Sequence, residues 1–305
     1  MRLVFAGSPE TALPSLAAVA ASGHELVGVV TREDSPHGRK RELRATPIAE
    51  AAAELGVPVI KANRLAGPAT EAIAALAPDL GVIVAYGGLV RKPLLSLPEH
   101  GWINLHFSLL PRWRGAAPVQ HAIIAGDDLT GATVFRLVEE LDAGDVYGQL
   151  TQQIAGHQTS GSLLAELADS GARLLVDVID AIAGGTASPQ PQSGDVTLAP
   201  KLTLDDGRVD WARNAREVDS RIRGVTPEPG AHTTIDGARL KILDATPAPD
   251  AAPLPPGRIR FVEGRVLAGT ADHPIELLQV QPAGKTAMRA GDWWRGQRTE
   301  ELVTQ

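Results

Sequence analysis

The 305-residue sequence contains no cysteine, and aromatic residues make up only 4% of it. The absence of cysteine excludes disulfide bonds, thiolate nucleophiles and zinc sites that use cysteine, and it is typical of a reducing compartment. The eight histidines show no metal-ligand spacing, so we expect no metal site. No apolar run approaches the roughly 20 residues of a membrane span. The apolar start, Met1 to Pro9, is too short for a signal peptide. We therefore expect a cytoplasmic protein without a membrane partner.

The sequence also lacks the motifs of common nucleotide sites. Gly7-Ser8-Pro9 follows the first expected strand, but it has neither the dinucleotide glycine pattern nor a P-loop lysine, so NAD and ATP chemistry are poorly supported. The net charge of −7 weighs mildly against a nucleic-acid partner. Local basic patches decide such binding more than global charge does, so the net charge leaves the question open.

The first 185 residues alternate short apolar runs with helical patterns. We expect strands at 3–6, 25–30, 57–61, 80–86, 102–107 and 132–138, and helices at 11–22, 46–55, 69–76, 117–125 and 160–182. Strands buried on both faces, with helices between them, predict an α/β fold with a doubly wound, mostly parallel sheet.

Residues 186–200 are rich in Pro, Gln, Ser and Gly, and this composition predicts an extended linker, which we place at 186–204. After it, a helix is expected at 210–223 and short strands at 232–235, 238–243, 257–262, 265–268 and 275–280. Several short strands between turn signals favour a small, OB-like β-barrel. The predicted layout is a catalytic domain at 1–185, a linker at 186–204 and a barrel domain at 205–305.

Two expected strand ends carry residues suited to a site. At the first, Ala85 to Gly88, paired glycines let the backbone approach a flat ligand closely. At the second, Asn104 and His106 are two apart in a strand and therefore point to the same side. An amide can donate to a developing oxyanion and an imidazole can donate or move a proton, which suits acyl transfer. Both could instead be core polar groups with satisfied hydrogen bonds.

The segment from 139 to 145 places carboxylates in a glycine-containing turn after a strand, a usual position for a catalytic acid. Spacing alone does not choose among its four carboxylates, and a solvated acidic loop is the alternative. They are Glu139, Glu140, Asp142 and Asp145.

The segment 32–44 holds five basic residues against three acidic ones and contains Pro36 and Gly38, so we expect a long, flexible surface loop. It is either a solvated mixed-charge loop or a basic arm beside an acidic substrate such as an RNA backbone. Its cations are Arg32, Arg39, Lys40, Arg41 and Arg44.

Asn104, His106, the segment Ser108-Leu-Leu-Pro111 and Asp142 together resemble the folate-dependent formyltransferases, which carry Asn-x-His-x-Ser-Leu-Leu-Pro and a later Asp-x-Gly. The resemblance implies that Asn104, His106 and Asp142 are catalytic. We expect Asp142 to orient His106 and favour its charged form, or to accept a proton through water. It also implies 10-formyltetrahydrofolate as the formyl donor. The residues expected to hold the donor are Ser108, Leu109, Leu110 and Pro111, with Ala85, Tyr86, Gly87 and Leu89 contributing through the backbone.

The resemblance covers about residues 2 to 290 and is greatest to family members that formylate methionine on initiator tRNA. It rests on Phe5–Pro9, Val84–Gly87, Pro111–Pro118 and Gln281–Lys285. It implies aminoacylated initiator tRNA as the partner, a role in translation initiation, and contacts between the acceptor stem and Arg39, Lys40 and Arg41. We expect a monomer.

Two alternatives stay open at this point. A formyltransferase acting on another amine, such as a sugar nucleotide, would keep the chemistry, although the length of the second domain counts against it. A catalytically silent RNA-binding protein would have no need of the intact trio. One departure from the family is Phe107, where a small residue is usual. Strand alternation should point its ring away from the site.

Overall fold

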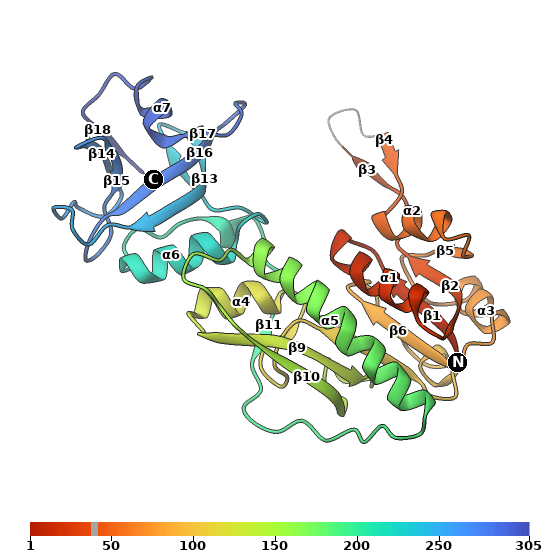
Figure 1. Cartoon of the computed structure of the whole chain (residues 1–305). Coiled ribbons are helices and arrows are strands. Elements are labelled where there is room, and N and C mark those ends of the chain that lie inside the picture. The colour runs from red at the N-terminus through yellow and green to blue at the C-terminus, as the bar shows by residue number, and fades with distance from the viewer. Residues whose placement is uncertain (38–41, 305) are drawn as a thin grey trace. The chain divides into compact units, whose positions relative to one another are not determined.

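In the computed structural model, which describes residues 1–37 and 42–304, a seven-stranded sheet occupies the first part of the chain (Figure 1). The strand order is β10-β9-β7-β6-β1-β2-β5. The five strands from β7 to β5 in this order are parallel to one another, and β9 is antiparallel to β7. The predicted doubly wound, mostly parallel sheet is therefore confirmed. The strands are β1 Arg2–Gly7, β2 Glu25–Thr31, β5 Val59–Lys61, β6 Leu80–Val84, β7 Trp102–His106, β9 Leu129–Arg136 and β10 Val146–Gln153.

Helices cover both faces of this sheet. Ile73 packs with Val4 and Trp102 in one buried cluster. On the opposite face, a Cβ added at Gly171 would lie 3.1 Å from the methyl groups of Leu105, so the long helix passes close to β7 there. Among the described residues, no helix is both long and apolar enough to cross a membrane. The helices are α1 Leu13–Ala21, α2 Pro47–Glu54, α3 Pro68–Ala75, α4 Pro118–Ala125 and α5 Ser160–Ala183.

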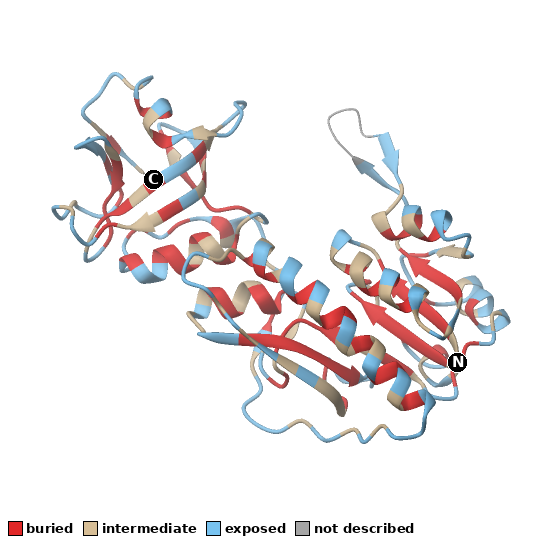
Figure 2. Cartoon of the chain, viewed as in Figure 1, coloured by how far each residue is buried: buried red, intermediate tan, exposed pale blue. Residues whose placement is uncertain are grey.

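The strand order reverses between β1 and β6, where the chain runs to β2 on one side and to β7 on the other. The neighbouring parallel strands β1, β6 and β7 end at Gly7, Val84 and His106, so these residues share the carboxyl edge of the sheet. Ligands of doubly wound sheets bind outside this edge at the reversal. The buried strands leading to it are shown in Figure 2.

The basic segment after β2 is not simply a loop. Ser35–His37 (β3) and Glu42–Arg44 (β4) form an antiparallel pair, so the expectation of a flexible loop was wrong for these two arms. Cross-strand backbone hydrogen bonds order the arms although their mixed charges gave no strand pattern. Arg39, Lys40 and Arg41 lie outside the described residues.

The segment predicted as a linker is extended, but part of it is hydrogen-bonded to the first unit. Gln190 bridges to Val146, and Leu198–Ala199 (β11) pairs in parallel with Arg114–Gly115 (β8). Contacts divide the chain into one unit of 1–118, 130–152 and 164–199 and a second of 119–129, 153–163 and 200–305. The predicted boundaries at 185 and 204 stay a prediction, to be tested by truncation.

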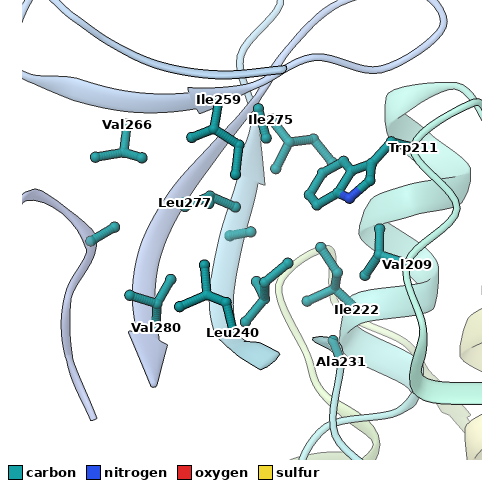
Figure 3. Close-up of a cluster of buried hydrophobic side chains, with 14 of the residues drawn as sticks. Val209, Trp211, Ile222, Ala231, Leu240, Ile259, Val266, Ile275, Leu277 and Val280 are labelled. Carbon is teal, nitrogen blue, oxygen red and sulfur yellow. The ribbon is translucent and has the colours of Figure 1, made fainter. Parts of the chain in front are cut away.

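The second unit contains an antiparallel sheet in the order β12-β13-β16-β15-β14-β18, with β17 paired to β16. An isolated bridge pairs Ile235, the last residue of β12, with Thr304, the residue after β18, so the two ends of this strand order meet at one point. The core of this unit includes Trp211, Ile222, Leu240, Ile259 and Leu277 (Figure 3). The strands are β12 His232–Ile235, β13 Ala238–Pro247, β14 Arg258–Val262, β15 Arg265–Ala268, β16 Ile275–Pro282, β17 Met288–Arg289 and β18 Glu301–Val303, and a short helix, α7, spans Ala290–Trp294.

Helix α6 spans Ala215–Gly224 and begins later than the predicted residue 210. The side chain of Asn214 accepts a hydrogen bond from the backbone N–H of Glu217 at 2.9 Å and so caps the helix. Before this cap, Asp210 accepts a bond from the backbone N–H of Ala212 in a separate turn. The prediction was wrong here because the helical spacing of apolar residues already begins in this turn, whereas the helix itself begins only after the capping Asn214.

Candidate active site

His106 ends β7 and is held by a backbone carbonyl. Its Nε2 lies 2.8 Å from the carbonyl oxygen of Trp113. A carbonyl oxygen can only accept, so Nε2 carries the proton and the neutral ring leaves Nδ1 unprotonated. Nδ1 lies 3.8 Å from Oδ2 of Asp142, whose side chain is 10% exposed. The structure thus brings together two of the three predicted catalytic residues, with the basic nitrogen of His106 facing Asp142.

The protonation of His106 depends on opposing effects. Burial lowers the pKa of His106 from its ordinary value of 6.5, while the charge of Asp142 and the hydrogen bond with the Trp113 carbonyl both act to raise it. Burial dominates, so the net direction is downward. Asp142 does favour the charged form, as expected, but burial outweighs it. The imidazole of His106 is therefore mainly neutral at neutral pH.

Asp142 is held in a tight turn. Its Oδ2 accepts a 2.8 Å hydrogen bond from the backbone N–H of Gly115. Asp142 has a φ of 48°, in the left-handed region that most residues avoid. A Cβ added at Gly144 would lie 1.8 Å from the carbonyl oxygen of Arg136, so this turn excludes any side chain there. The Asp-x-Gly spacing thus has a steric cause.

Two of the other three carboxylates of this segment, Glu139 and Glu140, pair with basic side chains. Glu139 pairs with Lys92 at 3.1 Å, and Glu140 pairs with Arg114 at 3.3 Å. The side chains of Glu139 and Glu140 are 66% and 76% exposed, respectively. Of the carboxylates in this segment, Asp142 is the one that faces His106.

Asn104 lies on β7 two residues before His106, so the two side chains share one face of the strand. It is half-buried, unlike its buried neighbours Ile103 and Leu105. Its side chain makes no hydrogen bond with any other residue that the structure describes. A half-buried amide with free donors at the carboxyl edge of a sheet can bind an oxygen of a ligand. The buried Phe107 follows directly after the strand.

The segment after His106 is closed into a turn by its own polar groups. The hydroxyl of Ser108 donates to the carbonyl of Arg112 at 2.6 Å. Thr133 donates to the carbonyl of Ser108 at 2.7 Å and accepts from the N–H of Leu110 at 3.3 Å, and Gln149 donates to the carbonyl of Leu110 at 3.1 Å. Ser108 therefore acts on the shape of the segment. Leu109 is half-buried, whereas Leu110 and Pro111 are buried.

The segment after β6 presents backbone and one apolar side chain. Ala85 and Gly87 have positive φ values of 49° and 76° and are exposed. Tyr86 is buried and its hydroxyl donates to the carbonyl of Ala62 at 2.5 Å, so its ring belongs to the core. Leu89 is 64% exposed. The exposed groups of this segment are Ala85, Gly87 and the side chain of Leu89, and their contact with a ligand stays a prediction.

Sequence reasoning missed the groups that hold the site, namely the Trp113 carbonyl, the Gly115 N–H, Thr133 and Gln149. Two of these are backbone groups, which leave no side-chain signature. Across the described residues, no cluster of three or more His, Asp or Glu side chains could hold a metal ion.

Comparison with known proteins decides the family. The model of the formyl transferase family matches residues 1–179, and the model of its C-terminal domain matches residues 201–298. The chain belongs to the formyl transferase family. Members similar to it along the whole chain include the methionyl-tRNA formyltransferase of Clavibacter sepedonicus, 60% identical over 303 residues and covering 99% of each chain. The methionyl-tRNA formyltransferase of Streptomyces coelicolor is 52% identical over 305 residues, covering 99% of this chain and 98% of that one.

Solved structures of formyl transferases share the fold at low identity. An N-formyltransferase from Helicobacter canadensis, in complex with folinic acid and dTDP-3-aminofucose, has a TM-score of 0.70 and 17% identity, covering 92% of this chain and 98% of that one. Methionyl-tRNA formyltransferase from Clostridium thermocellum has a TM-score of 0.56 and 14% identity, covering 81% and 93%. These similarities establish the fold and leave the substrate undecided.

Proposed function

We propose that the chain transfers the formyl group of 10-formyltetrahydrofolate to the amino group of methionine esterified to initiator tRNA, for translation initiation. The observation that carries this proposal is the 52–60% identity, over essentially the full length, with methionyl-tRNA formyltransferases. The paired His106 and Asp142 at the carboxyl edge of the sheet support the chemistry.

The formyl donor would be bound between the two strand ends that the sequence singled out. The backbone of 85–87 and the side chain of Leu89 come from the end of β6, and the turn of 108–111 follows the end of β7. These strands are neighbours in the sheet, so both segments leave the same edge. An exposed leucine beside exposed backbone suits a flat, hydrogen-bonding ring such as a pterin, because it offers an apolar contact and polar groups together.

His106 would move the proton. The amine of the substrate attacks the formyl carbon, and the carbonyl oxygen becomes an oxyanion while the nitrogen becomes positively charged. Nδ1 of neutral His106 accepts a proton from this nitrogen. The resulting imidazolium donates it to N10 of the folate as the bond from carbon to N10 breaks, so the proton balance closes without a covalent enzyme intermediate.

Asp142 and Asn104 would supply the electrostatic contributions. The carboxylate of Asp142 lies 3.8 Å from Nδ1 and stabilises the imidazolium while the proton is held there. Asn104 donates a hydrogen bond from its amide to the oxyanion. Removal of one such donor typically lowers kcat by about 10²–10³-fold. Arg39, Lys40 and Arg41, between the β3 and β4 arms, would contact the acceptor stem of the tRNA.

The test is a formyl-transfer assay with 10-formyltetrahydrofolate and three acceptors, namely methionyl initiator tRNA, the same tRNA without methionine and a dTDP-linked aminosugar. Formylation of the charged tRNA alone is expected. Turnover of the aminosugar in its place would assign the chain to the sugar-nucleotide alternative. Binding of tRNA without turnover of any amine would favour the silent RNA-binding alternative.

A further inference from the structure

The stretch 190–199, predicted as part of a linker, lies along the loops that carry the candidate active site. The backbone N–H groups of Arg114 and Ala117 donate to the carbonyls of Thr197 and Ala199 at 2.9 and 3.1 Å. The hydroxyl of Thr197 accepts the N–H of Trp113 at 2.8 Å. A segment that served only as a tether would need none of these bonds. The contacts therefore point to a role in shaping the site.

Gln192 is the side chain of this stretch with the most connections. Its Nε2 donates to the carbonyls of Asp142 and Gly144 at 2.7 and 2.9 Å. Its Oε1 accepts from Nε and Nη2 of Arg114 at 3.1 and 2.7 Å. Carbonyls only accept and a guanidinium only donates, so the orientation of the amide is fixed, and all four of its hydrogen-bonding positions are used.

These four bonds link the two segments that meet in the hydrogen bond between Asp142 and Gly115. One segment is the turn that carries Asp142 itself. The other is β8, where Arg114 precedes Gly115, whose N–H donates to Oδ2 of Asp142. Gln192 therefore bonds to the backbone on one side of the contact and to the neighbouring side chain on the other.

The conformation of Asp142 makes such support necessary. A non-glycine residue at a φ of 48° persists only where its surroundings determine it. Gln192 donates to the carbonyl of this same residue and to the carbonyl two residues later. Without these bonds, the peptide groups of the turn could relax, and the carboxylate would leave its position beside Nδ1 of His106.

We propose that Gln192 is a positioning residue that holds Asp142 beside His106 and does not itself touch either substrate. The proposal rests on the function proposed above. The amide of Gln192 sets the distance and orientation of the Asp142 carboxylate toward the proton-transferring imidazole. A small misplacement of such a group can lower a reaction rate by about 100-fold.

Two substitutions separate the two sides of the amide. Gln192→Met keeps the length of the side chain and loses all four bonds. Gln192→Glu keeps the acceptors for Arg114, loses both donors and places negative charge against two carbonyls. Gln190→Met is the matched control, since Gln190 lies two residues earlier and, among the described residues, its side chain bonds only to Ser188.

We expect both Gln192 variants to lower kcat by about 10- to 100-fold, with the KM for methionyl-tRNA within about twofold of wild type. Gln190→Met should retain wild-type kcat. Wild-type kcat in both Gln192 variants would overturn the proposal. A lower kcat in Gln192→Met alone would also overturn it, because the rate would then depend on the bonds to Arg114 and not on the bonds to the Asp142 turn. Thermal melting of each variant separates loss of fold from loss of position.

An NMR titration of the His106 ring supplies a readout that does not depend on turnover. The ring signal is assigned with His106→Asn. In Gln192→Met the displaced carboxylate should raise the pKa of His106 less, so the ring should titrate at a lower pH than in wild type, whereas Gln190→Met should leave it unchanged. An unchanged titration in Gln192→Met would overturn the proposal even where the acceptor proves to be another amine. A wild-type protein inactive with methionyl-tRNA would instead contradict the proposed function.

Discussion

The carbonyl oxygen of Trp113 lies 2.8 Å from Nε2 of His106, and this contact determines which ring nitrogen carries the proton in the neutral imidazole. Because Nε2 carries the proton, the lone pair of the neutral ring is on Nδ1, on the side of Asp142. Trp113 itself has a φ of 60°, and the peptide group that carries this carbonyl donates its Arg114 N–H to the carbonyl of Thr197 at 2.9 Å, so the group is held on both sides. The tautomer of His106 is thus set by a peptide group seven residues beyond the imidazole.

The pH dependence of catalysis follows from this arrangement. His106 must be neutral to accept a proton, so kcat/KM should rise with pH through the pKa of His106. Burial lowers that pKa, so the half-maximal point should lie below the ordinary value of 6.5. Asp142 acts to raise the pKa, so Asp142→Asn should move the acid limb to still lower pH and reduce kcat.

The measurement is the profile of kcat/KM between about pH 4.5 and 8, the range around an ordinary histidine pKa. Glu139→Gln is the matched control, because Glu139 lies in the same segment but pairs with Lys92. The idea fails if the acid limb of Asp142→Asn moves to higher pH or coincides with that of Glu139→Gln.

Asn104 should affect the rate of transfer far more than the binding of either substrate. Its amide makes no hydrogen bond with another described residue, so Asn104→Ala should leave the melting temperature close to wild type. Loss of an oxyanion donor should reduce kcat by about 10²–10³-fold with little change in either KM. Steady-state kinetics with each substrate varied in turn measure this. A rise in KM with unchanged kcat would instead make Asn104 a binding residue.

Most of the first sheet could be predicted because its strands are short, strongly apolar runs. Strand alternation also placed Asn104 and His106 on one face of β7. The strand β10 was missed because its residues, from Val146 to Gln153, are largely polar and only partly buried. Helix α6 was predicted too long, because the capping role of Asn214 depends on a turn that apolar spacing does not reveal.

The connections that position the site could not be predicted from sequence. Gly115 and Asp142 are 27 residues apart, and Gln192 lies 50 residues beyond Asp142. These bonds end on backbone carbonyl groups, which every residue has, and on a backbone N–H, which every residue except proline has, so no residue type marks the position. The composition of 186–204 was interpreted as a linker for the same reason. Polar, apolar-poor segments look alike whether they are solvated or hydrogen-bonded to loops.

Gly115 should be intolerant of any side chain. It has a φ of 128°, and an added Cβ would lie 2.6 Å from the carbonyl oxygen of Ala199, so Gly115→Ala must displace β8 or β11. Strain at such a position costs on the order of 1–3 kcal/mol. We expect a lower melting temperature and a reduced kcat, because the N–H of Gly115 donates to Asp142.

Gly156→Ala is the control, since a Cβ at Gly156 would meet no atom within 4 Å. Thermal melting and steady-state kinetics of the two variants should differ clearly. Equal stability and equal turnover in both would contradict the steric account of the β8–β11 contact.

The basic residues between β3 and β4 should act on tRNA and not on the formyl donor. Replacing Arg39, Lys40 and Arg41 by glutamine removes three positive charges that we expect to lie against phosphates. Each phosphate contact changes the slope of log affinity against log salt by about 0.7–0.9, so the salt dependence of the tRNA KM should flatten by roughly 2. The KM for tRNA at low salt should rise at least about tenfold, because three phosphate contacts are lost.

The KM for 10-formyltetrahydrofolate should not change, and it serves as the internal control. If the tRNA KM and its salt slope both match wild type, these cations form a solvated loop, and the acceptor stem must be held by other basic side chains of the protein.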